Sequence, residues 1–213
     1  QNLTINQIVV TGNYFTPKID ILEQAGIEIG IKPDSVNLDK VKLQIERLNY
    51  VHSITPYIDP IGRVKLSVKE RNPIALLVKG GQNVYVDADG VRLPIIAGKT
   101  IDLPLVYGFD TRLSTDTLKS PEFTQIRDFL IGAVQSPLSW ATISEVAYDP
   151  DIGVVALSHE NGVKLLFGLN EFETKLRNWE AFYTHVVNTK GIRRMQQIDL
   201  RFSNQVITRE VES

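Results

Sequence analysis

The alternation of apolar and polar side chains changes character within residues 64–78. Apolar residues occupy every second position from 64 to 68, with lysine or serine between them. This two-residue period predicts a strand with one buried face. Residues 74–78 are continuously apolar, which predicts a strand covered on both faces. Pro73 lies between the two runs and cannot donate to a strand ladder. We therefore predict that one domain ends and another begins here.

Before this boundary, the pattern begins with a strand and a helix. An imperfect strand signal over residues 3–10 ends at a Thr-Gly-Asn turn. Thr16 is then placed as an N-cap, with Pro17 at the first helical position. Gly26 follows apolar residues at helical spacing and predicts the end of that helix.

A second helix and a hairpin complete the first domain. Apolar residues at helical spacing over residues 38–48, after a capping Asn37, predict the helix. Strand-like runs over residues 51–59 and 62–70, joined by a Pro-Ile-Gly turn, predict the hairpin. The order β-α-α-β-β favours two helices on one face of a three-stranded sheet.

The remaining residues predict an antiparallel sheet with two helices. Asp89-Gly90 and Asn161-Gly162 lie between apolar runs and favour hairpins, the first with a type I′ turn. Helices are expected over residues 114–135 and 171–188. Strands are expected over residues 84–87, 91–93, 143–148, 153–158, 163–167, 198–202 and 206–211. The expected fold class is α+β, a small β-α-α-β-β domain followed by a mainly antiparallel β-sheet domain with two flanking helices.

Composition is that of a globular protein. The chain has 213 residues, 43% of them hydrophobic and 23% charged, which excludes wholesale disorder. A net charge of −2 gives no basic field for nucleic acid. No apolar run approaches the roughly 18 residues that cross a bilayer. These residues therefore belong either to a soluble protein or to a longer protein with its membrane anchor outside this sequence.

Patterns of catalytic or metal chemistry are not found. Without cysteine, the chain has no disulfides, thiol nucleophiles or cysteine-based zinc sites. His52, His159 and His185 show no metal-ligand spacing. The Gly-Lys-Thr at residues 98–100 lacks the earlier glycine of a phosphate loop. We expect no enzyme activity, no cofactor and no metal. An enzyme acting on the cell wall stays open, because carboxylates that meet only in space are invisible in the sequence.

Short segments spread along the chain resemble one known family. V-T-G-N after the first strand and L-N-Y-V before the second resemble a POTRA (polypeptide-transport-associated) domain. E-R-N-P-I-A at residues 70–75 resembles the segment that follows the POTRA domain in the FtsQ/DivIB family of bacterial cell-division proteins. Further similar segments are V-D-A-D-G at residues 86–90, L-P-L-V-Y-G at residues 103–108 and I-D-L-R-F at residues 198–202.

The resemblance implies a domain plan and a cellular role. It implies a POTRA domain at residues 1–71 and an FtsQ-type β domain at residues 72–213. One transmembrane helix upstream would anchor the protein in the cytoplasmic (inner) membrane, with both domains facing the periplasm or cell exterior. The implied function is a non-enzymatic divisome scaffold that recruits membrane division proteins and links early and late division proteins for septal cell-wall synthesis.

Partner binding is expected at strand edges, where unpaired N–H and C=O groups can accept another strand. The pattern of residues 205–211 fits both an ordinary closing strand and a docking edge. The resemblance implies that single-span FtsB/DivIC-like and FtsL-like proteins bind near the last strands, and that other divisome proteins use the POTRA domain. The implied partner-binding residues are Phe202, Ser203, Asn204, Val206 and Ile207.

One feature bears on these expectations. Some family members carry a basic residue after the glycine equivalent to Gly168, whereas this chain has Leu169 and Asn170, so an ion pair to an acidic partner is not expected there.

The alternative function is a POTRA-type protein-transport or outer-membrane assembly chaperone. Such proteins usually carry tandem POTRA repeats, and this sequence shows one.

Overall fold

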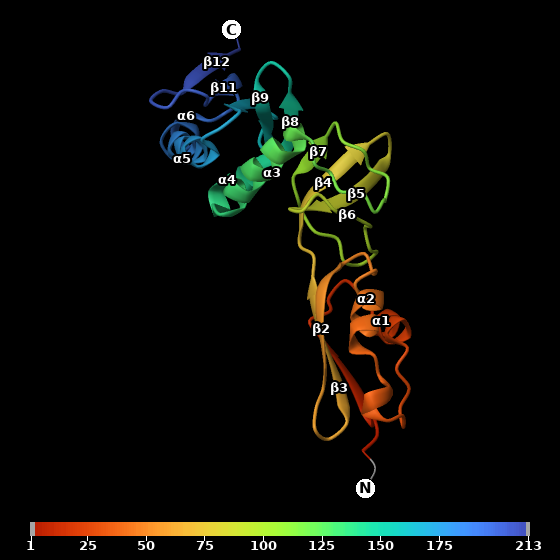
Figure 1. Cartoon of the computed structure of the whole chain (residues 1–213). Coiled ribbons are helices and arrows are strands. Elements are labelled where there is room, and N and C mark those ends of the chain that lie inside the picture. Colours follow the sequence, from red (N-terminus) through yellow and green to blue (C-terminus); the bar gives the residue numbers. More distant parts are fainter. Residues whose placement is uncertain (1–2, 212–213) are drawn as a thin grey trace. The chain divides into compact units, whose positions relative to one another are not determined.

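The computed structural model describes residues 3–211, which form two compact units (Figure 1). The first unit comprises residues 3–72 together with 96–99. The second comprises residues 73–95 and 100–211. Each unit has its own hydrophobic core.

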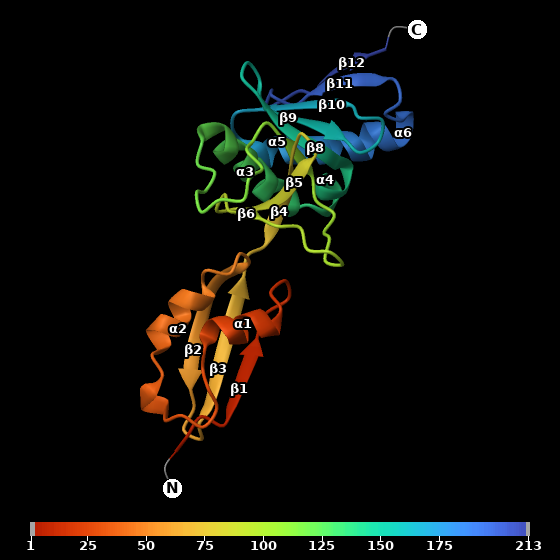
Figure 2. The ribbon, with the colours of Figure 1, turned by 90° about the vertical axis from the view of Figure 1, so that its right-hand side faces the viewer.

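The first unit is a three-stranded sheet with two helices on one face (Figure 2). Its elements are β1 (Gln7–Thr11), α1 (Lys18–Ala25), the 3-10 turn η1 (Pro33–Ser35), α2 (Leu38–Ile45), β2 (Val51–Ile58) and β3 (Arg63–Glu70). The strand order is β1-β3-β2, with β1 parallel and β2 antiparallel to β3. Val64, Leu66 and Val68 on β3 are buried beneath the helices, as their alternation predicts. The predicted α+β layer is confirmed.

Glu70, the last residue of β3, fixes the chain as it enters α1. Its carboxylate accepts the backbone N–H groups of Tyr14 (2.7 Å), Phe15 (2.9 Å) and Thr16 (2.7 Å). The prediction of Thr16 as N-cap was wrong by one residue, because Glu70 holds Thr16 before the helix and Pro17 occupies the cap position. The predicted cap of α2 is confirmed: Asn37 Oδ1 accepts the N–H of Lys40 at 2.9 Å.

Gly12 allows the chain to leave β1 close to β3. Its φ is +83°, in the left-handed region that favours glycine. A Cβ at this position would overlap the carbonyl oxygen of Val68. The V-T-G-N segment therefore has a steric reason for its glycine.

The second unit contains one large sheet flanked by helices. Its elements are β4 (Pro73–Lys79), β5 (Gln82–Asp87), β6 (Arg92–Leu93), β7 (Leu105–Tyr107), α3 (Pro121–Val134), α4 (Pro137–Thr142), β8 (Ile143–Asp149), β9 (Gly153–Ser158), β10 (Lys164–Gly168), α5 (Phe172–Phe182), the π-helical turn η2 (Tyr183–Val187), α6 (Asn188–Lys190), β11 (Met195–Asp199) and β12 (Ile207–Glu210). Within residues 73–211, the strand order is β12-β11-β10-β9-β8-β7-β4-β5-β6. Five of these eight neighbour pairs are antiparallel and three are parallel, so the predicted mainly antiparallel sheet is confirmed.

Helices α3 and α5 join the core through aromatic side chains. Phe129 of α3 packs against Phe167 of β10, with ring centroids 4.6 Å apart. Trp179 of α5 is fully buried and donates its indole N–H to Thr142 Oγ1 at 2.9 Å. On β4 the face with Ala75 and Leu77 is fully buried, whereas the face with Ile74, Leu76 and Val78 is half-buried. The prediction that both faces of this strand are covered therefore holds fully for one face and in part for the other.

Two predicted helices have different bounds in the structure. The helix expected from residue 114 begins at Pro121, because Ser120 caps it and accepts the N–H of Phe123 at 3.2 Å. The helix expected over residues 171–188 changes to a π-helical turn after Phe182. Apolar spacing predicted both helices, whereas caps and local distortions set their ends.

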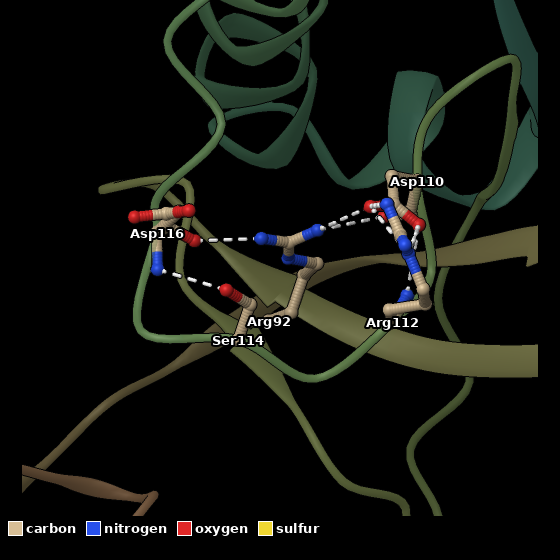
Figure 3. A network of polar contacts seen from close by, with 5 residues as sticks. All are labelled: Arg92, Asp110, Arg112, Ser114 and Asp116. Atoms are coloured by element: carbon tan, nitrogen blue, oxygen red, sulfur yellow. Dashed lines mark hydrogen bonds and ion pairs between the residues drawn. The ribbon is translucent and has the colours of Figure 1, made fainter.

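A buried arginine organises the loop before α3 (Figure 3). The Arg92 side chain is 4% exposed, lies 3.2 Å from Asp110 Oδ2 and donates to the carbonyl of Asp116 at 2.7 Å. Hydrogen bonds from Arg112, with the charges of Arg112 and Arg92 adding, hold the pKa of Asp110 far below its usual value. The helix predicted over residues 114–135 therefore included residues 114–120, which belong to this loop.

The two predicted turn pairs have different geometries. Asn161 and Gly162 both have positive φ, 59° and 57°, as a type I′ turn requires. In the other turn Gly90 has positive φ but Asp89 does not, so the predicted type I′ turn was wrong. The Asp87 carboxylate shapes that turn instead, because it accepts the N–H groups of Asp89 and Val91.

Replacing Glu70 should weaken the first unit. Glu70→Gln removes the negative charge and one of the two acceptor oxygens for three N–H donors, so we expect a loss of about 1–2 kcal/mol in the free energy of unfolding. Urea denaturation followed by circular dichroism measures it. Glu23→Gln, on the exposed surface of α1, is the control and should change little. Equal stabilities for the two variants would contradict the assigned role of Glu70.

Replacing Gly12 should cost more than replacing another glycine of similar φ. Gly12→Ala combines positive φ with the overlap at Val68, and we expect a loss of at least about 2 kcal/mol. Gly26→Ala is the matched control, because its φ is +58° with no atom within 4 Å of the added Cβ; it should cost about 1 kcal/mol. Thermal melting of both variants tests the order, and the reverse order would show that packing at Val68 is not limiting.

Candidate partner-binding site

Strand β12 is one edge of the large sheet. Within residues 3–211 it pairs with β11 and has no strand on its other side. All four of its residues are exposed, and 47% of the Ile207 surface is accessible. An edge of this kind presents unpaired backbone groups to any incoming strand.

The pairing register shows which backbone groups point outward. Leu200 donates its N–H to Leu166 on β10, so the alternating backbone of β11 directs Asp199 toward β12. Asp199 lies opposite Ile207, whose polar backbone groups therefore point inward. Thr208 and Glu210 consequently direct their N–H and C=O groups away from the sheet.

Most of the predicted site residues lie in the turn between β11 and β12. The predicted strand over residues 198–202 was wrong at its end, because β11 stops at Asp199. Phe202 is 43% exposed, and Ser203 and Asn204 are exposed beside it. Val206 differs from them, because it is half-buried and packs against the core.

An ion pair within the I-D-L-R-F segment ends the strand and shapes this turn. Arg201 donates from Nε to Asp199 Oδ1 at 2.9 Å and from Nη2 to Oδ2 at 2.7 Å. The Arg201 backbone N–H also reaches Asp199 Oδ1, at 3.1 Å. Burial alone would raise the pKa of Asp199, but these hydrogen bonds and the positive charges of Arg201 and Lys175 outweigh it and lower the pKa. The guanidinium lies 5.9 Å from the centroid of the Phe202 ring, and this side chain is exposed at the surface.

A groove of about 290 Å³ lies between α5 and this turn. Asn178, Ala181 and Phe182 line it from α5, and residues 203–206 line it from the turn. Asn178 Nδ2 donates to the Ser203 carbonyl at 3.4 Å. The sequence did not identify the α5 residues, because their position beside the turn depends on the tertiary fold. The signal available in the sequence was the helical spacing of the apolar residues of α5, which include Phe182.

The positive charge nearest to the segment after Gly168 is that of a buried lysine, Lys175. Leu169 is 52% exposed, and the nearby Lys175 is buried. Lys175 Nζ donates to the Asn170 carbonyl at 2.6 Å, and burial lowers the pKa of this ammonium group. The cation of this segment therefore points inward and is held by a backbone carbonyl.

Neither a metal-binding cluster nor a membrane-spanning helix is found among residues 3–211. Residues 3–211 bring together no group of three or more histidine, aspartate or glutamate side chains that could hold a metal. No helix in the described part of the chain has the length and apolar character needed to cross a membrane.

Comparison with known proteins gives relatives over nearly the whole chain. The cell division protein FtsQ of Rhodothermus marinus is 26% identical, with 99% of this chain and 79% of that protein covered. The cell division protein FtsQ of Salinibacter ruber is also 26% identical, with 98% of this chain and 83% of that protein covered. The major extracytoplasmic domain of the cell division protein DivIB from Geobacillus stearothermophilus is a structural match with a TM-score of 0.39 and 17% identity; it covers 56% of this chain and 97% of that chain.

Family models match both units. A model for the POTRA domain of FtsQ type matches residues 3–71. A model described as FtsQ/DivIB, C-terminal related, matches residues 72–209. The family expected from the short sequence segments is confirmed, in preference to the transport chaperones. The chain belongs to the FtsQ/DivIB family of bacterial cell-division proteins.

Proposed function

We propose that this chain is a non-enzymatic scaffold of the divisome that recruits FtsB/DivIC-like and FtsL-like membrane proteins through β-strand edges. The observation that carries the proposal is β12, whose outer backbone groups have no strand partner within residues 3–211. Its family places the chain in cell division. A strand edge of this kind can bind other proteins through backbone hydrogen bonds, without catalysing a reaction.

The partner would add a strand beside β12. The outward groups of Thr208 and Glu210 would supply ladder hydrogen bonds, as in other strand additions. Phe202 and Ile207 would supply apolar contact, and burying the exposed part of Phe202 would contribute up to about 2 kcal/mol. The groove beside residues 203–206 could receive one further apolar side chain of the partner.

The rest of the chain would position this edge within the division machinery. In the proposed plan, residues 1–71 are the POTRA domain and residues 72–213 the β domain. An upstream transmembrane helix anchors the protein in the cytoplasmic membrane, with both domains outside it. Strands β1 and β2 form the two edges of the first sheet, where other divisome proteins could attach. The protein would thereby link early and late division proteins for septal cell-wall synthesis.

Removing the apolar contacts should abolish binding without unfolding the chain. We expect Phe202→Ala to weaken binding of an FtsB/DivIC-type extracytoplasmic peptide by up to about thirtyfold, and addition of Ile207→Asp to eliminate it. Isothermal titration calorimetry measures the affinity, and circular dichroism verifies folding. Leu43→Asp, at a 63% exposed position of the first unit, is the matched control. Undiminished binding by the double variant would refute the site.

Blocking one outward N–H should separate strand addition from simple apolar contact. Thr208→Pro removes that donor and leaves the pairing of β12 with β11 in place, because edge strands tolerate proline at such positions. We expect at least about tenfold weaker peptide binding. Thr208→Ala keeps the N–H and is the control. Equal affinity of the proline and alanine variants would mean that the partner binds without joining the sheet.

A further inference from the structure

A second groove, of about 290 Å³, lies at the carboxyl ends of β7 and β8, away from β12 in the sheet order. Tyr107 ends β7, and Tyr148 lies one residue before the end of β8. Apolar rings dominate the lining, which also includes the start of α3. The lining residues are Tyr107, Gly108, Phe109, Tyr148 and Pro150, with Ser120 and Glu122 from the helix side.

Local contacts hold two of these lining residues in place, Phe109 and Pro150. Phe109 packs edge-on against the buried Phe123, with ring centroids 5.6 Å apart and an interplanar angle of 80°. Asp149 Oδ1 accepts the N–H groups of Asp151 (2.9 Å) and Ile152 (3.1 Å), which fixes the turn that carries Pro150. The groove is therefore formed before any ligand arrives, which lowers the entropic cost of binding.

The groove offers hydrogen-bond donors that the fold does not use. Among the described residues, neither the Tyr107 hydroxyl nor the Tyr148 hydroxyl has a hydrogen-bond partner, whereas the Tyr85 hydroxyl accepts the Ile101 N–H at 2.8 Å. Ser120 Oγ already accepts the N–H of Phe123. The groove thus combines exposed aromatic surface with two free phenolic donors.

We propose that this groove binds a proline-rich segment in the polyproline II conformation. Such a segment has no internal hydrogen bonds, and its carbonyl groups are fully available as acceptors. Proline also lacks an N–H, so the segment presents mainly acceptors, which matches the donors of Tyr107 and Tyr148. Aromatic-lined grooves are a recurring way to recognise this rigid helix.

Charge at the groove selects a basic flank on the peptide. Glu122 lines the groove, and Asp149 and Asp151 lie on either side of Pro150. None of these three carboxylates forms an ion pair with another described residue. Lys119 is the cation nearest in sequence to the helix side of the groove, but it does not line it. An arginine or lysine beside the prolines would therefore find an acidic rim.

A glycan matches the groove less well. Sugar hydroxyls both donate and accept, so they need acceptors as well as donors from the protein. Glu122 is the sole carboxylate among the lining residues, and Ser120 Oγ is already engaged. Each phenolic hydroxyl needs an acceptor for its proton, and every carbonyl group of a proline-rich peptide can supply one without bringing an N–H that needs its own acceptor.

The test is titration of the whole chain with an octaproline peptide that ends in a pair of arginines, followed by NMR. We expect chemical-shift changes centred on Tyr107, Phe109 and Tyr148. Tyr107→Phe should weaken binding about threefold by removing one donor, and Tyr107→Ala about tenfold by also removing the ring. Tyr57→Ala, a 51% exposed tyrosine of the first unit, is the matched control and should leave the affinity unchanged.

Three outcomes would overturn the proposal. The first is equal binding of an octaalanine peptide with the same two arginines, which would mean attraction by charge alone. The second is undiminished proline-peptide binding by a folded Tyr107→Ala variant. The third is a lack of shift changes at millimolar proline peptide, while an oligomer of N-acetylglucosamine perturbs the same residues; that result would assign the groove to a glycan. Tyr107→Phe keeps the ring and so remains informative if the alanine variant does not fold.

Discussion

An open β-sheet must end in a strand whose outer backbone groups lack a strand partner, and this constraint governs the second unit. At the β6 end the sheet narrows to two residues, and both are buried. At the β12 end the described chain supplies no such cover. Charged side chains at Arg209 and Glu210 are the usual protection of an exposed edge. The two ends of the sheet are therefore treated unequally, and this is why the proposed partner strand is assigned to β12.

Carboxylates that accept nearby backbone N–H groups shape the connections in both units. Glu70 does so before α1, Asp87 in the β5–β6 turn and Asp149 in the β8–β9 turn. Asp199 combines the same bond with a bidentate arginine. Each carboxylate satisfies backbone N–H groups that have no strand or helix partner. Because the acceptor is charged, these hydrogen bonds are strong and fix the geometry of the loop without help from buried apolar side chains. Several short segments that resemble the family contain these residues.

Sequence patterning predicted what depends on local periodicity and missed what depends on distant contacts. The alternation of residues 64–68 correctly predicted the buried face of β3, and Asn37 correctly predicted a cap. Apolar composition predicted two covered faces for β4, but one of them is only half-buried, because composition cannot show how far each side is covered. The helical pattern also ran into a loop that Arg92 organises from another part of the chain. Phe182 beside residues 203–206 could not be predicted, since that contact exists only after folding.

The half-buried Val206 affects the entropic cost of adding a strand beside β12. The turn before β12 is held at one end by Asp199 and Arg201 and at the other by the packing of Val206 against the core. The receiving edge therefore loses little conformational entropy on association, and nearly all the ordering cost falls on the incoming segment. A flexible segment that must order on arrival binds with less affinity than its contact area suggests.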